Sequence, residues 1–191
     1  CDTEVRVTAC PAFLHSDPCV EQSYHTGVNF RPWFDMDRST LSYYFDYNQN
    51  ININKAKVNY INQAKLICNK IKNPVFIPFH PNDENFAREH LDIDTMKFKF
   101  SVEETLRRVS SVKKMVCTRY HSLVFAAVCR KPSLAISYAP KVSLLCNRLD
   151  IPSYQPTVDN IPIEFNKPCG LKSLEEKAEA NINILCDIIN K

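Results

Sequence analysis

Glycine is scarce in this chain. Only Gly27 and Gly170 occur among its 191 residues. A Walker-type phosphate loop and a Gly-x-Gly-x-x-Gly dinucleotide turn both need closely spaced glycines, because the backbone itself must approach a phosphate group. The chain therefore contains neither motif. Any phosphate that it binds must be held by side chains and by the N-termini of helices.

Long apolar runs and an excess of charge are also absent. Although 45% of the residues are hydrophobic, no run approaches the about eighteen apolar residues of a membrane span. The 24 Lys and Arg residues nearly balance the 21 Asp and Glu residues, which gives a formal net charge of +3. The basic residues form no block of the kind found on nucleic-acid surfaces. We expect no membrane span and no nucleic-acid partner.

Metal-ligand spacings are missing too. The sequence has no Cys-x-x-Cys pair, no His-x-x-x-His motif and no run of carboxylates with ligand spacing. Asp35 and Asp37 are the one weak candidate pair for a cation, and a turn after Pro32 accounts for them equally well. We therefore expect no metal and no cofactor.

The nine cysteines are interpreted mainly as small hydrophobic residues. Five of them are predicted to lie on apolar faces or in strands, where a free cysteine packs like other apolar side chains: Cys68, Cys117, Cys129, Cys146 and Cys186. The simpler interpretation is a reduced, cytoplasmic chain. Bridges among Cys1, Cys10 and Cys19 remain open as an alternative.

Strands and helices alternate along the chain. The hydrophobic pattern predicts strands at 5–8, 26–30, 74–79, 96–100, 114–117 and 133–137, and helices at 54–72, 83–90, from 101 onward, 118–130, 140–149 and 173–189. Helical crossovers of roughly ten to twenty residues imply a parallel sheet that is covered on both faces. The predicted class is α/β, a doubly wound, mainly parallel, Rossmann-like lobe. Residues 1–191 are expected to form a single domain.

Some helix details follow from the same pattern. Asp83 is predicted to cap the helix 83–90, and Ser101 is predicted to open the next helix as part of a capping box with Glu104. In the helix 54–72, the predicted buried stripe contains Val58, Ile61, Lys65, Cys68 and Ile71. Lys65 would lay its stem along this stripe and keep its amine in water.

Arg119, His121 and Lys141 stand out within the strand, helix, strand, helix unit of residues 114–149. In parallel sheets, ligands bind at the carboxyl ends of strands, and all three residues fall at such ends. Each taken alone has an ordinary explanation, as a surface charge, a helix cap or a solvated first-turn lysine. Their convergence instead favours a site for an anionic substrate.

The segment 118–151 resembles the C-terminal signature of the polysaccharide pyruvyl transferase family. It contains an Arg-x-His-Ser turn at 119–122, an apolar helix, a proline, a short strand and a Tyr-x-Pro-Lys-Val segment at 138–142. Weaker similarities occur at 7–14 and 74–83, and the Arg-Pro-Trp at 31–33 also matches. The resemblance covers roughly residues 5–152.

Two positions depart from the family pattern. Cys10 stands where an aspartate usually precedes the proline, and Ala139 stands where an aspartate usually lies between the tyrosine and the proline. The resemblance also implies that this chain is the C-terminal lobe of a two-lobed, glycosyltransferase-B-like enzyme. We therefore expect an additional N-terminal lobe.

The resemblance implies an activity and a set of roles. Enzymes of the family move the pyruvyl group of phosphoenolpyruvate onto two hydroxyls of a saccharide as a ketal, with release of phosphate. We assign Arg31 and Arg119 to the carboxylate and phosphate, because the planar guanidinium pairs with such oxygens. Lys141 would be a further phosphate contact. His121 would be the proton donor, because an imidazole populates both of its forms near neutral pH.

Further residues receive weaker assignments. His80 and Asp83 are candidates for contacts with the acceptor hydroxyls or for proton relay. Tyr138 is interpreted either as a residue that lines the cleft or as a packed tyrosine at a strand end. Two other functions stay open, namely a glycosyltransferase lobe that binds a nucleotide sugar and a non-catalytic module that binds anions or saccharides.

Overall fold

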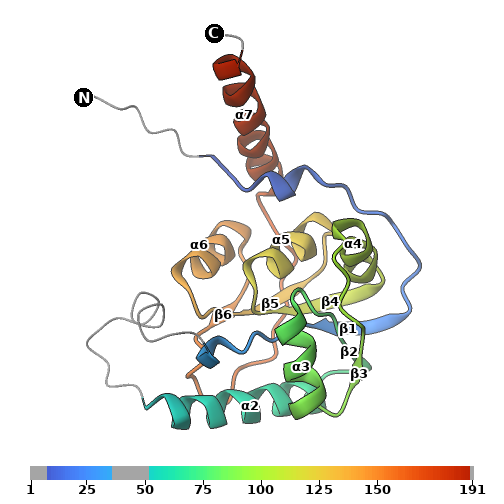
Figure 1. Ribbon diagram of the computed structural model, residues 1–191, viewed down its shortest axis with the longest axis vertical. Coiled ribbons are helices and arrows are strands. Elements are labelled where there is room, and N and C mark those ends of the chain that lie inside the picture. The colour runs from blue at the N-terminus through green and yellow to red at the C-terminus, as the bar shows by residue number, and fades with distance from the viewer. Residues whose placement is uncertain (1–7, 36–51, 190–191) are drawn as a thin grey trace.

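Six parallel strands form one sheet in the computed structural model, which describes residues 8–35 and 52–189 (Figure 1). The strands are β1 (Tyr24–Val28), β2 (Pro74–Phe76), β3 (Asp94–Thr95), β4 (Val112–Cys117), β5 (Ser133–Ile136) and β6 (Ser153–Tyr154). Their spatial order is β3-β2-β1-β4-β5-β6, which is that of a Rossmann-type doubly wound sheet. The predicted α/β class is therefore confirmed. The strand order reverses between β1 and β4, where sheets of this type bind ligands.

Helices cover both faces of the sheet (Figure 1). On one face lie α2 (Ile53–Lys70) and α3 (Pro81–His90), and on the other lie α4 (Val102–Ser110), α5 (Tyr120–Val128) and α6 (Pro140–Leu149). Two short 3₁₀ helices, η1 (Pro11–Leu14) and η2 (Trp33–Asp35), precede α2 in the chain. Each crossover helix thus returns the chain to the amino end of the next parallel strand, so that the loops that follow the strands share one edge of the sheet.

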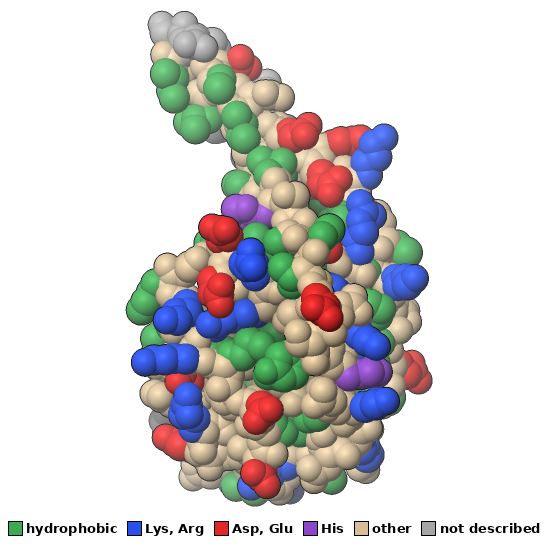
Figure 2. Space-filling model, turned by 90° about the vertical axis from the view of Figure 1, so that its right-hand side faces the viewer, with side chains coloured by type: hydrophobic (Ala, Val, Ile, Leu, Met, Phe, Trp, Pro, Cys, Tyr) green, Lys and Arg blue, Asp and Glu red, His purple; other side chains and the backbone are tan. Residues whose placement is uncertain are grey.

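Helix α7 (Leu171–Ile189) projects away from the sheet. Its first half buries Leu174 and Ala178, and Asn181 donates from Nδ2 to the carbonyl oxygen of Ala9 over 2.6 Å. Its second half exposes apolar side chains, among them Ile182, Leu185, Ile188 and Ile189, and Figure 2 shows hydrophobic side chains along this projecting helix. No helix within the described residues is long and apolar enough to cross a bilayer.

Several sequence predictions need correction. Helix α3 begins at Pro81, and its cap is His80, whose side chain accepts from the N–H of Asn82 over 3.2 Å, so the prediction that Asp83 caps this helix is wrong. Proline suits the first helical position, where no N–H is needed. The strand predicted at 96–100 is also wrong, since β3 contains only Asp94 and Thr95. The strand predicted at 5–8 lies outside the described residues except for Thr8.

The buried face of α2 differs from the predicted stripe. Ala56, Tyr60, Ala64 and Ile67 are buried there, whereas Val58 is 58% exposed. Cys68 and Ile71 are buried as predicted, whereas Ile61 is half-buried and Lys65 is exposed. The prediction is therefore confirmed only for the C-terminal end of the stripe, because the large apolar residues of this helix are distributed around its circumference.

The cysteine predictions hold with one exception. Cys68, Cys117, Cys129 and Cys146 are buried as expected, but Cys186 is exposed on α7. All cysteines in the described residues are free, so no bridge joins Cys10 to Cys19, and Cys1 lies outside these residues. Burial raises the pKa of the Cys68 and Cys146 thiols to about 12, which keeps them protonated and unreactive near neutral pH.

Gly27 is the fourth residue of β1 and is surrounded by side chains of the core. A Cβ atom at this position would clash with Met115 Sδ and would lie 3.0 Å from Ile77 Cδ1 and 3.1 Å from Val112 Cγ2. We expect Gly27→Ala to lower the free energy of unfolding by about 2–3 kcal/mol, because the added methyl overpacks this core. Urea denaturation measures the change, and Asn62→Ala at an exposed position of α2 is the control. A loss below about 0.5 kcal/mol, the range of ordinary surface substitutions, would contradict this packing.

Candidate functional site

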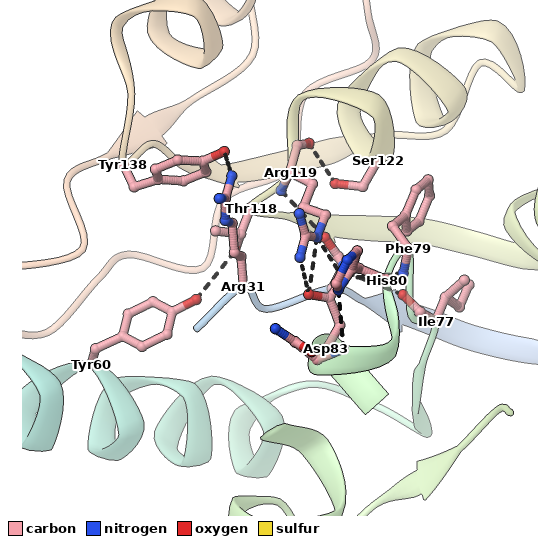
Figure 3. Close-up of polar contacts among 12 residues, drawn as sticks. Arg31, Tyr60, Ile77, Phe79, His80, Asp83, Thr118, Arg119, Ser122 and Tyr138 are labelled. Carbon is pink, nitrogen blue, oxygen red and sulfur yellow. Dashed lines mark hydrogen bonds and ion pairs between the residues drawn. The ribbon is translucent and has the colours of Figure 1, made fainter. Parts of the chain in front are cut away.

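Polar side chains gather where β1, β4 and β5 end (Figure 3). Asn29 and Arg31 follow β1, Thr118 and Arg119 follow β4, and Tyr138 follows β5. Figure 3 shows Arg31 and Arg119 at the centre of this edge, with Tyr138 beyond Arg31 and Asp83 below Arg119. The site thus lies at the point where the strand order reverses.

Arg119 forms a paired salt bridge with Asp83. Its Nε donates to both carboxylate oxygens, over 2.9 and 2.7 Å, and its Nη2 donates to Oδ1 over 2.6 Å. The Asp83 side chain is fully buried, while that of Arg119 is 19% exposed. Because two of its nitrogens hold Asp83, the guanidinium is fixed in orientation. Within the described residues, the hydrogen bonds of the Arg119 side chain involve only its Nε and Nη2 atoms and not Nη1.

Asn29 completes the network below Arg119. Its Nδ2 donates to Asp83 Oδ2 over 3.1 Å and to the carbonyl oxygen of Ile77 over 3.2 Å. Its Oδ1 accepts from the backbone N–H of Arg119 over 3.3 Å. Asp83 Oδ2 also accepts from the backbone N–H of Phe79 over 3.1 Å. The ends of β1, β2 and β4 are therefore tied together by buried polar groups, which are costly to leave unpaired.

Arg31 reaches from the end of β1 across to β5. Its Nη1 donates to the hydroxyl oxygen of Tyr138, and its Cζ lies 4.7 Å from the centroid of the Tyr138 ring. This contact combines a hydrogen bond with a cation–π interaction. Below it, the hydroxyls of Tyr60 and Thr118 lie 3.5 Å apart in the buried interior. Burial raises the pKa of Tyr60 far above that of an exposed tyrosine, so this hydroxyl stays protonated.

His121 and Lys141 stand in the first turns of α5 and α6, and both are exposed. The Nε2 atom of His121 lies 3.7 Å from Cys10 Sγ, and Lys141 Nζ lies 5.9 Å from the centroid of the Tyr120 ring. Desolvation lowers the pKa of His121 below its ordinary value of 6.5, and the positive charges of Lys141 and Arg119 lower it further. The imidazole is therefore mainly neutral at pH 7 in the ligand-free chain.

The pKa of His121 gives a direct test of this clustering. In an NMR titration of the imidazole we expect a midpoint below 6.5, and Lys141→Ala should move it upward because one repelling charge is lost. Added phosphate should also move it upward, because an anion favours the imidazolium. Lys167→Ala removes a charge from another exposed lysine and is the control. An unchanged midpoint in Lys141→Ala would contradict the proximity of the two residues.

Helices α5 and α6 start at the site without side-chain caps. The N-cap residues Arg119 and Ala139 make no capping hydrogen bond, whereas Asn52, His80 and Ser101 cap α2, α3 and α4. The N–H groups of an uncapped first turn carry partial positive charge. Together with Arg31 and Lys141, these two helix ends give the edge a local positive field.

The predicted site residues are thus only partly brought together. Arg31 pairs with Tyr138 and Arg119 pairs with Asp83 at the same edge of the sheet, where the exposed His121 and Lys141 also stand. His80 is an exposed helix cap next to it, and Asp83 is too deeply buried to reach a ligand directly. Sequence reasoning missed Asn29, although its position directly after a buried strand was a usable signal. No cluster of metal-ligating side chains occurs within the described residues, and Asp37 lies outside them.

Two cavities flank the cluster. One, of about 390 Å³, lies on the side of Tyr138 and is bordered by Ser137, Pro140, Leu144 and Gln155. The other, of about 400 Å³, includes His121 and Phe79 in its wall. Both volumes are in the range of small-molecule sites.

The comparisons with known proteins give a family for this chain. A family model described as polysaccharide pyruvyl transferase matches residues 1–140 of the 191-residue chain. The matched stretch includes Arg31, Arg119 and His121 and ends one residue before Lys141. Neither the curated proteins nor the solved structures contain a significant match to this chain.

Proposed function

Because the chain belongs to the polysaccharide pyruvyl transferase family, we propose that it transfers the pyruvyl group of phosphoenolpyruvate to two hydroxyls of a saccharide. The products are a cyclic ketal and inorganic phosphate. The observation that supports this most strongly is the placement of Arg31 and Arg119 at the switch point of the sheet, beside two uncapped helix N-termini. Phosphoenolpyruvate carries a carboxylate and a phosphate, and this edge offers several separate groups for anions.

The guanidinium groups have distinct roles in this proposal. Arg119 presents Nη1 to the donor while Asp83 holds its Nε and Nη2, so one oxygen of the substrate is met at a fixed position. Arg31 approaches from the other side with its orientation set by Tyr138. The N-terminus of α5 and the amine of Lys141 add positive charge for the phosphate. Asp83 and Asn29 position these groups without touching the substrate.

His121 supplies the proton in the proposed mechanism. Its lowered pKa leaves it neutral in the free chain, and the bound phosphate raises the pKa so that the imidazole takes up a proton. Transfer of that proton to the methylene carbon makes the adjacent carbon cationic, and one saccharide hydroxyl adds there. Phosphate then leaves with its bonding electrons, the second hydroxyl closes the ketal, and the two hydroxyl protons pass to phosphate or water. His80, the exposed cap of α3, would contact an acceptor hydroxyl in this scheme.

Two other functions use the same positive edge. In a glycosyltransferase lobe, this edge would bind the diphosphate of a nucleotide sugar. In a non-catalytic module, it would bind an anion or a saccharide without turnover. The two departures from the family pattern, Cys10 and Ala139, are the reason for the second alternative. Cys10 lies beside His121, and Ala139 is the N-cap residue of α6. The family match favours pyruvyl transfer over both.

Ligand-induced stabilisation separates these functions. We expect phosphoenolpyruvate to raise the melting temperature of the chain, and UDP-galactose and GDP-mannose to leave it unchanged, because ligands that bind the folded state alone stabilise it. Phosphate release from phosphoenolpyruvate in the presence of a saccharide acceptor should then be lost in His121→Ala with binding retained. Stabilisation by the nucleotide sugars alone would refute pyruvyl transfer, and unchanged turnover in His121→Ala would refute the assigned proton donor.

A further inference from the structure

Several aromatic rings line the cavity beside His121. Its wall includes Phe79, Phe98, Phe100 and Phe125, and its volume is about 400 Å³. The rings form two pairs, with the centroids of Phe98 and Phe100 4.6 Å apart and those of Phe79 and Phe125 5.7 Å apart. His15 stands edge-on to Phe125 at 6.2 Å. The lining residues come from η1 and the residue after it, the loop after β2, the loop before α4 and helix α5.

Phe100 contributes to this cavity without contributing to the core. Its side chain is 93% exposed, more than any other exposed large hydrophobic residue within the described part of the chain. An aromatic ring that stays in water contributes no burial free energy to folding. Exposed apolar side chains that cluster around a cavity commonly mark a binding site. Because Phe100 is exposed and also lines the cavity, its ring is available to contact a ligand there.

The loop that carries Phe98 and Phe100 is held in place. The N–H of Phe98 donates to Glu84 Oε2 over 2.6 Å, and the carbonyl oxygen of Lys97 accepts from Arg108 Nη1 over 2.6 Å. Ser101 then caps α4 by accepting from the N–H of Glu104 over 3.1 Å. Anchors on both sides of Phe100 display its ring in a defined position, which reduces the ordering cost of binding.

The cavity borders the anion cluster through His121 and Phe79. His121 belongs to its wall, and Phe79, also in the wall, donates its backbone N–H to Asp83, the partner of Arg119. A ligand in this cavity would therefore lie against the His121 imidazole, which we assign as the proton donor to phosphoenolpyruvate. The cavity beside Tyr138 contains a tyrosine but no phenylalanine and does not reach His121.

We propose that the aromatic cavity is the acceptor subsite, where one face of a saccharide ring stacks on Phe98 and Phe100. A pyranose presents C–H groups on its faces and hydroxyls at its rim, which suits an aromatic wall with polar groups around it. Ser101, Thr105 and Lys99 stand at the border of the cavity and provide that polar rim. This assignment rests on the proposed pyruvyl transfer. In it, the saccharide hydroxyls reach phosphoenolpyruvate from the side of the aromatic cavity.

Ligand-observed NMR with two simple probes tests the subsite. Methyl β-galactopyranoside and methyl α-mannopyranoside are titrated into the full chain in the presence of phosphoenolpyruvate, and phosphoenolpyruvate affinity is measured separately by calorimetry. We expect at least one glycoside to bind, with affinity reduced roughly tenfold in Phe100→Ala and largely kept in Phe100→Trp. Leu144→Ala is the matched control, because Leu144 is also exposed but borders the other cavity.

The outcomes separate the subsite from the function. Binding of phosphoenolpyruvate with glycoside affinity unchanged in Phe100→Ala, or reduced in Leu144→Ala instead, would overturn the subsite and leave the pyruvyl transfer standing. Failure of both glycosides to bind the wild-type chain would also overturn it. Failure of phosphoenolpyruvate to bind, with glycoside binding still dependent on Phe100, would overturn the proposed function while leaving a saccharide site.

Discussion

Replacing Asp83 with alanine is expected to lower the free energy of unfolding by about 3–5 kcal/mol, because breaking a buried ion pair leaves one charge uncompensated. Asp83 is fully buried and accepts from the Arg119 side chain, the Asn29 amide and the Phe79 N–H. All of these donors would lose their acceptor together. Urea denaturation measures the loss. Phosphoenolpyruvate binding should weaken as well, because Arg119 would lose its fixed orientation.

A double-mutant cycle separates the charge from the cavity. Adding Arg119→Ala to Asp83→Ala removes the orphaned guanidinium, so the double variant should be more stable than the sum of the two single changes predicts. Glu104→Ala is the control, because Glu104 is 44% exposed and its pair with Arg108 one helical turn away contributes only about 0.5 kcal/mol. A loss of less than about 1 kcal/mol in Asp83→Ala would show that the pair does not organise this edge.

Arg31→Ala is expected to weaken phosphoenolpyruvate binding by roughly 100-fold. Hydrogen bonds between charged groups contribute about 1.5–3 kcal/mol each, and about 1.4 kcal/mol corresponds to a tenfold change in affinity. Calorimetric titration measures the affinity directly. Arg107→Ala removes the same charge from an exposed position of α4 and should leave affinity within about twofold, since exposed charges are screened by salt.

If Arg31→Ala and Arg107→Ala lost the same affinity for phosphoenolpyruvate, Arg31 would act only through the net charge of the chain and not through a direct contact. A loss of affinity in Arg31→Ala that disappears at high salt would also show that Arg31 acts only through its charge. The proposed direct contact instead predicts a loss that persists when the ionic strength is raised.

The strand and helix pattern around Arg119 was predictable because it is local. Short apolar runs, Pro132 and Pro140 mark the boundaries of β5 and α6 within one or two residues, and the family resemblance then pointed to Arg31. Since all strands are parallel, residues that follow them necessarily share an edge. The general location of the candidate site therefore follows from the order of the elements.

The partner of Arg119 was not predictable in the same way. Asp83 follows Pro81 by two positions and has the sequence features of a helix cap, but the cap is His80 and the carboxylate turns inward to Arg119, 36 residues further along the chain. Likewise, the exposure of Phe100 follows from tertiary anchoring of its loop. Such pairings depend on how α3 and the loop before α4 pack on the sheet, which periodicity does not encode.

A crystal structure with phosphoenolpyruvate bound tests the central claim most directly. We predict that the phosphate and carboxylate of phosphoenolpyruvate bridge Arg31 and the Nη1 atom of Arg119 at the start of α5, with the methylene carbon facing His121. The Asp83 salt bridge should be unchanged. Phosphoenolpyruvate bound away from the carboxyl ends of β1 and β4, or bound there with His121 turned away from the methylene carbon, would contradict it.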